Sequence, residues 1–169
     1  GWAKIELVDI SKPLPLENDS IKYIYCSHVL EHFERFQAVD ILKECHRVLS
    51  KNGRLRLVLP DIKKIAELYF KDLDLVKTDK KLRPGRRFSR RWWGFDKDVR
   101  PVGPLGKLAR SFIRDHHWQY DRQEVLVLLE EAGFEKIGLL EYKKGRAPDL
   151  DKLDLPEHRD HSLYVEAVK

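Results

Sequence analysis

The chain has 169 residues, of which 42% are hydrophobic and 36% are charged, and its formal net charge is +5. This length is enough for one buried core, and no apolar run reaches the roughly 18 residues that a membrane helix needs. We therefore expect one soluble domain, residues 1–169. The two cysteines, Cys26 and Cys45, have no paired or metal-type spacing, which favours a cytoplasmic location.

The first third of the chain has the pattern of strands that alternate with helices. Apolar and polar residues alternate over residues 3–8, which predicts a strand that ends before Asp9. Prolines within residues 12–16 predict a loop, because proline offers no backbone donor to a sheet. The apolar run at 21–26 predicts a strand covered on both faces. Apolar residues at helical spacing over residues 36–49 then predict a helix with one buried face.

A second strand and a second helix follow in the same order. Asn52 and Gly53 predict a left-handed cap that ends the first helix, and residues 54–59 predict a strand. Asp61 precedes apolar residues at helical spacing; it could face an acceptor, but we favour a helix N-cap. This succession predicts an α/β fold that contains right-handed βαβ units and a mostly parallel sheet.

Residues 71–118 break this rhythm, and we expect them to form an insertion or lid. The segment contains a basic cluster at residues 80–91, the adjacent tryptophans Trp92 and Trp93, and a region near residues 105–113 that we expect to be helical. The basic cluster predicts an anionic partner, although charge runs also occur on plain solvated surfaces. The tryptophans could stack on bases or sugars, or they could cover the open edge of the sheet.

The pattern becomes regular again at the carboxyl end. Asp121, with Glu124 three residues later, predicts the start of a helix that Gly133 ends. Residues 137–141 and 163–168 then predict two strands. We expect these strands to form an antiparallel hairpin.

Short motifs spread over nearly the whole chain outside the insertion occur together in one known family. They are Asp9-x-x-x-Pro13-Leu14-Pro15, Asn18-Asp19-Ser20, Tyr23-Ile24-Tyr25, Ser27-His28-Val29-Leu30-Glu31-His32, Leu42-x-Glu44-x-x-Arg47-Val48-Leu49, Gly53, Leu59-Pro60-Asp61, His117-Trp118-x-Tyr120-Asp121, Leu129-x-x-Ala132-Gly133-Phe134 and Leu163-Tyr164-Val165-Glu166. In order and spacing they resemble the class I S-adenosylmethionine-dependent methyltransferases, type 11 group. The resemblance implies a Rossmann-like fold and a transferase that uses S-adenosylmethionine to methylate a glycan, a small molecule or an anionic substrate.

The resemblance also implies which residues bind the cofactor. These are Asp9, Ile10, Ser27, His28 and Val29, with Asp9 contacting the adenine or the ribose. The glycine-rich loop of the family has no counterpart in the sequence, so we expect the family's first strand or two to be missing. A catalytically degenerate binding module with this fold is the alternative.

A sheet that lacks those strands would expose unpaired backbone groups along one edge. Such edges recruit another chain, so we expect a homodimer. The alternative is direct pairing between the strand that ends at Val8 and the strand that ends at Cys26.

Several polar residues are candidates for chemistry on the acceptor. A histidine with a pKa near neutrality suits general-base catalysis, so His32 is the candidate base, and a packing role at the first helical turn is the alternative. His117, Tyr120 and Trp93 are the candidate substrate contacts, with His116 weighed beside them. We expect Glu31, Glu44 and Arg47 to form structural pairs.

Residues 28–32 also spell H-x-x-E-H, which occurs in zinc proteases on a helix. Five residues make a weak signature, and His28 falls at the end of a predicted strand. We therefore rank a zinc hydrolase last and predict no metal ligands.

Overall fold

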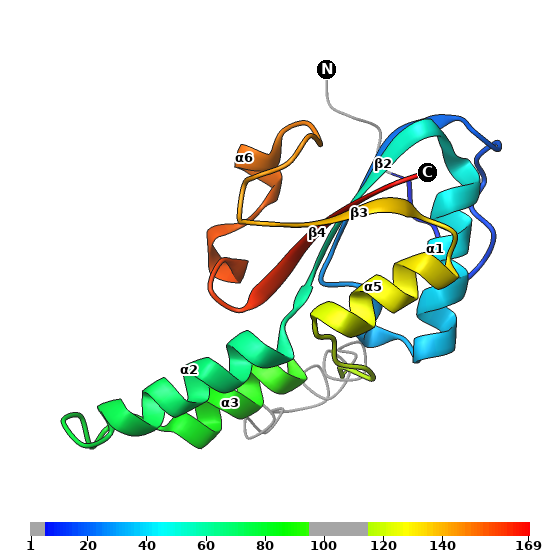
Figure 1. Ribbon diagram of the computed structural model, residues 1–169. Coiled ribbons are helices and arrows are strands. Elements are labelled where there is room, and N and C mark those ends of the chain that lie inside the picture. Colours follow the sequence, from blue (N-terminus) through cyan, green and yellow to red (C-terminus); the bar gives the residue numbers. More distant parts are fainter. Residues whose placement is uncertain (1–5, 95–114) are drawn as a thin grey trace.

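The computed structural model describes residues 6–94 and 115–169 (Figure 1). The elements along these residues are β1 (Ile21–Ser27), the short 3-10 helix η1 (Leu30–His32), α1 (Arg35–Val48), β2 (Leu49–Pro60), α2 (Ile62–Leu75), α3 (Pro84–Trp93), α5 (Arg122–Glu131), β3 (Glu135–Leu140), α6 (Leu150–Leu153), η2 (Pro156–His158) and β4 (Ser162–Val168).

The four strands form one sheet in the order β1-β2-β4-β3. β1 and β2 are parallel, with α1 as the connection between them, whereas β4 is antiparallel to both of its neighbours. The predicted α/β class and the antiparallel pair at the carboxyl end are confirmed. The expectation of a mostly parallel sheet is wrong for the described strands, because β4 takes a central position beside β2 and reverses the direction there.

The apolar core lies on one face of the sheet. Alternate residues of β2, Leu55, Leu57 and Leu59, are buried there with apolar residues of α1 and α5. Figure 1 shows these two helices beside each other along the sheet. Each leucine buried in this way contributes about 1.5–3 kcal/mol relative to an exposed one, so this layer supplies most of the driving force for folding.

The opposite face of β2 carries a buried ion pair. Arg56, which alternates with the core leucines, is fully buried and donates to Asp154 Oδ2 at 2.5 Å. Its second terminal nitrogen donates to the Lys144 carbonyl at 3.0 Å. Tyr25 of β1 adds a hydrogen bond from its hydroxyl to the Leu153 carbonyl at 2.7 Å. These contacts hold the connection between β3 and β4 against the sheet.

The predicted first strand is wrong for the part that the structure describes. Residues 6–9 have no regular secondary structure, the Leu7 side chain is fully exposed, and residues 3–5 lie outside the described residues. The loop that follows is hydrogen-bonded to α1: Leu14 N donates to Glu44 Oε1 at 2.6 Å, and Arg47 donates to the Leu14 carbonyl. Among the described strands only β2 pairs with β1, so the outer edge of β1 is open. The alternative pairing through Val8 is therefore not found there.

The helix boundaries agree with the sequence patterns except at the end of α1. This helix ends at Val48, and β2 begins directly after it, although Asn52 does have the predicted left-handed φ, at 62°. The predicted caps of α2 and α5 are confirmed: Asp61 accepts from Lys63 N at 2.9 Å, and Asp121 accepts from Glu124 N at 2.8 Å. The helix expected near residues 105–113 lies outside the described residues.

Candidate functional site

A cavity of about 470 Å³ opens where β1 and β2 end. These two strands are parallel, and the carboxyl ends of parallel strands are the usual place for a ligand in an α/β fold. Five of the chain's seven histidines reach this one cavity. Its wall consists of these histidines, one glutamate, three arginines and two small residues: His28, His32, His116, His158, His161, Glu31, Arg87, Arg90, Arg91, Pro60 and Gly94.

His28 enters the cavity from the residue directly after β1. Its φ of 53° is left-handed, which is uncommon for a residue other than glycine, and its backbone N–H donates to the Val58 carbonyl at 2.9 Å. On the side chain, Nε2 lies 3.0 Å from Ser162 Oγ and Nδ1 lies 3.2 Å from Glu31 Oε1. Both ring nitrogens of His28 therefore have polar neighbours.

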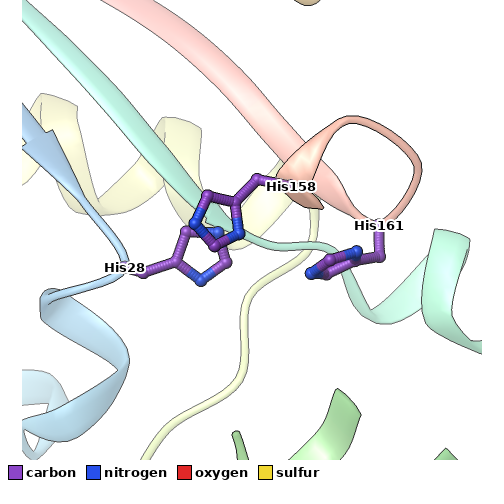
Figure 2. A group of neighbouring side chains, drawn as sticks. All are labelled: His28, His158 and His161. Atoms are coloured by element: carbon purple, nitrogen blue, oxygen red, sulfur yellow. The ribbon is translucent and has the colours of Figure 1, made fainter. Parts of the chain in front are cut away.

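His158 and His161 come from the turn between α6 and β4 and pack beside His28 (Figure 2). The rings of His28 and His158 are stacked with centroids 3.8 Å apart, and His161 meets both rings edge-on at about 6 Å. Burial, with the neighbouring His28 and His158, lowers the pKa of His161 to about 4. Burial and His28 also lower the pKa of His158. These two imidazoles are thus neutral at physiological pH.

Glu31 is the acidic residue of the cavity and is completely buried. Neither carboxylate oxygen has a hydrogen-bond partner among the described residues, since the approach of His28 is not aligned for one. Its backbone carbonyl accepts from His117 N at 2.7 Å and from Trp118 N at 3.2 Å. The predicted structural pair of Glu44 and Arg47 is confirmed at 2.6 Å, and in the part of the chain that the structure describes Glu31 lies within ion-pair distance of His28, at 3.2 Å, rather than of an arginine or lysine.

His32 and His116 face each other with ring centroids 5.0 Å apart. His32 Nδ1 lies 3.3 Å from the Asp115 carbonyl; because a carbonyl only accepts, this nitrogen carries the proton. Burial lowers the pKa of His116, and Glu31 opposes that change. Gly94, which ends α3 with a φ of 79°, lies so close that a Cβ there would come within 2.5 Å of His116 Nε2.

Three arginines of α3 form the remaining wall. Arg87 and Arg91 donate to the two oxygens of Asp72, a buried residue of α2, at 2.8 and 3.2 Å. These ion pairs and the aromatic contact of Phe88 with Tyr69 hold α2 against α3, and Phe88 also stacks on Trp92 within α3. The basic cluster is therefore more than solvated surface, because part of it lines the cavity. Trp92 packs within this helix pair, which extends away from the sheet (Figure 1).

The predicted cofactor residues lie in three different environments. His28 lines the cavity, whereas Ile10, Ser27 and Val29 line a second, mostly apolar hollow of about 560 Å³ along β1. Asp9 lines neither; it is exposed and accepts hydrogen bonds from Ser11 N and Oγ, which lower the pKa of its carboxyl group. The end of β1 thus separates two hollows, and Asp9 lies at neither of them.

The predicted substrate contacts do not line the cavity. His117 is partly exposed, and its Nδ1 lies 3.1 Å from Glu34 Oε1. Tyr120 is fully buried in the core, where its hydroxyl donates to the Leu30 carbonyl at 3.4 Å. Trp93 does not line the cavity either. His116, the residue before His117, does line it.

Sequence reasoning missed His158 and His161 as site residues. They are about 130 residues from His28, so only the fold brings the three together. The sequence signal that could have identified them is a pair of histidines three residues apart in a polar segment before the last predicted strand. The H-x-x-E-H signature is not realised as one helix, because His28 ends a strand and only residues 30–32 form a helical turn.

Residues 3–57 match the family model described as a methyltransferase domain, which confirms the predicted resemblance over that part of the chain. The fold is also shared with solved structures. A SAM-dependent methyltransferase of Methanosarcina mazei is 16% identical with a TM-score of 0.52, and the match covers 100% of this chain and 68% of that one. The S-adenosylmethionine-dependent methyltransferase of Mesorhizobium loti is 19% identical with a TM-score of 0.49, over 97% and 68% of the two chains.

Other matched proteins are much longer than this chain. A SAM-dependent methyltransferase of Archaeoglobus fulgidus is 11% identical with a TM-score of 0.47; the match covers 91% of this chain and 62% of that one. No curated protein matches the chain. Within residues 6–94 and 115–169, no helix has the length and apolar character needed to cross a membrane.

Proposed function

We propose that this chain transfers a methyl group from S-adenosylmethionine to an anionic acceptor. Its fold is that of the S-adenosylmethionine-dependent methyltransferases, and residues 3–57 match the model of a methyltransferase domain. The observation that carries the choice of acceptor is the row of arginines in the cavity wall. Arg87, Arg90 and Arg91 lie opposite the carboxyl ends of the parallel strands. Guanidinium groups bind carboxylates and phosphates through paired hydrogen bonds, so an acidic glycan or a small acid fits this wall.

The cofactor, when bound, supplies a methyl group on a sulfonium that is already a good leaving group, so the protein mainly has to position the acceptor. Ser27, His28 and Val29 are the residues that would hold its amino-acid end, because they lie where β1 ends between the two hollows. His32 is the candidate base. Its Nδ1 is held by the Asp115 carbonyl, so Nε2 has the lone pair that can accept a proton from an acceptor hydroxyl or amine.

The cofactor part of the proposal is tested by calorimetric titration of the chain with S-adenosylhomocysteine. We expect binding in the micromolar range that is weakened when Ser27 is replaced by proline, which removes a backbone donor at the end of β1. Asp9→Ala is the matched control: the exposed position of Asp9 predicts unchanged binding. A folded chain that binds no ligand at millimolar concentration would instead support a binding module without catalysis.

The acceptor part is tested by transfer of a labelled methyl group to paired acceptors that differ only in one acidic group. For Arg90→Ala we expect a rise in KM for the acidic acceptor of about tenfold or more, since a charged hydrogen bond contributes about 1.5–3 kcal/mol. Lys81→Ala is the control, because Lys81 belongs to the same basic cluster but does not line the cavity. Equal rates with neutral and acidic acceptors would refute the anionic substrate.

A further inference from the structure

We propose that Glu31, His32 and His116 form a binding site for a divalent transition metal of the zinc class. Each residue offers one ligand atom, and these three atoms lie within 4.8 Å of one another. Two imidazoles and one carboxylate are a common ligand set for zinc sites that keep a position open for water or substrate. Here the open position would face the cavity.

Glu31 provides the strongest support for a bound cation. Its side chain is completely buried, and within the described part of the chain neither oxygen accepts a hydrogen bond. An ionised carboxylate in such a place is costly unless a positive charge or hydrogen-bond donors compensate it. A divalent cation would compensate both oxygens at once. The nearest imidazoles, His28 Nδ1 at 3.2 Å and His116 Nε2 at 4.0 Å, leave this need unmet.

The surroundings of the other two ligands also suit a metal. A metal-bound histidine almost always donates its other ring N–H to a carbonyl or carboxylate, and His32 Nδ1 meets the Asp115 carbonyl in this way. The nitrogen left with a lone pair is Nε2, which binds either a proton or a metal ion, so His32 does not act as the base while the metal is bound. His116 is held beside Glu31 because the next two backbone N–H groups, of His117 and Trp118, both donate to the Glu31 carbonyl.

The second histidine cluster of the cavity suits a metal less well. His28, His158 and His161 also place one ligand atom each within 4.8 Å of the others. However, Figure 2 shows the rings of His28 and His158 stacked on each other, and their centroids are 3.8 Å apart. His28 Nε2 also lies 3.0 Å from Ser162 Oγ. This cluster also contains no carboxylate to balance the charge of the ion. It serves instead as the matched control.

The test measures zinc binding directly and needs neither a methyl donor nor an acceptor, so it stands apart from the proposed methyl transfer. The chain, free of any histidine tag and stripped with a chelator, is titrated with Zn²⁺ in competition with a chromophoric chelator. We expect one equivalent to bind tightly to the wild type. Glu31→Gln and His116→Ala should weaken binding more than about 100-fold, because loss of even an outer partner of a zinc ligand costs 10–100-fold. His158→Ala should bind as the wild type does.

A second measurement separates loss of the site from loss of the fold. Glu31→Gln keeps the shape of the side chain and breaks no hydrogen bond of the carboxylate among the described residues, so without metal it should fold and melt near the temperature of the wild type. Added Zn²⁺ should raise the melting temperature of the wild type and of His158→Ala, but not of Glu31→Gln. The proposal is overturned if the wild type does not bind Zn²⁺, if Glu31→Gln binds it equally well, or if His158→Ala abolishes binding while His116→Ala does not.

Discussion

Removing the charge of Asp154 should destabilise this fold more than removing any exposed charge. Asp154 and Arg56 are both fully buried, and the Asp154 carboxylate also accepts from Lys143 N at 2.9 Å and from the Tyr25 hydroxyl at 3.2 Å. In Asp154→Asn an amide NH₂ would replace one of these oxygens and leave the guanidinium of Arg56 without a counter-charge. Breaking a buried pair from one side costs about 3–5 kcal/mol.

That loss is large against the total stability of about 5–15 kcal/mol that is typical of a natural domain. At about 2–4 °C for each kcal/mol in a chain of this size, it corresponds to a fall in Tm of about 6–20 °C. Urea unfolding followed by circular dichroism gives the free energy directly. The matched control is Asp74→Asn, because Asp74 pairs with Lys77 at 2.8 Å on the exposed surface and should cost less than about 1 kcal/mol. If the two variants lose equal stability, the buried pair is not a major stabilising contact.

Three further outcomes follow from contacts elsewhere. Gly145→Ala should lower the free energy of unfolding, measured in urea, by about 2 kcal/mol or more, because φ of Gly145 is 154° and a Cβ there would come within 2.0 Å of Glu166 Oε1. Gly85 has open space around it, so Gly85→Ala should change that free energy by less than about 1 kcal/mol. Asp121→Ala removes the N-cap of α5 and should cost about 1 kcal/mol, an expectation that fails if Asp121→Ala and the wild type have the same urea midpoint. Hydrogen bonds from Arg47 and Leu14 N lower the pKa of Glu44 in the folded chain. The contribution of the Glu44 carboxylate to stability is therefore complete above the unfolded pKa of about 4.5, and it is lost as the pH falls through the folded pKa. Glu44→Gln should therefore be less stable than the wild type at pH 7 and should approach it in the acid range; a constant difference across pH would contradict this assignment.

The elements that the sequence predicted well are those with strong local signals. The helical spacing after Phe36 and the cap at Asp121 depend on neighbours in the sequence, and both are found as expected. The first strand is not found in its described part, residues 6–8, because an alternating pattern does not specify a partner strand. The structure shows that its loop instead binds α1 through Glu44 and Arg47.

The site could be predicted only in part, for a related reason. The polar turn after β1 was identified from residues 27–32, and it does line the cavity. The opposite wall, with His158, His161 and the arginines of α3, depends on where distant segments come together, and no local pattern contains that information. Glu31 was expected to be a structural partner. Its burial without a hydrogen bond is a property of the folded chain alone.

The open edge of β1 has a consequence for hydrogen exchange. In a parallel pair, successive residues of a strand direct their N–H groups alternately toward the partner and away from it. The amides of β1 that face β2 should exchange slowly with solvent deuterium. Those of the intervening residues, on the edge where none of the described strands pairs, should exchange quickly. A partner that added a strand to this edge would slow the fast set and leave the slow set unchanged. The alternating pattern of exchange along residues 21–27 is thus a residue-by-residue report of whether that edge is covered.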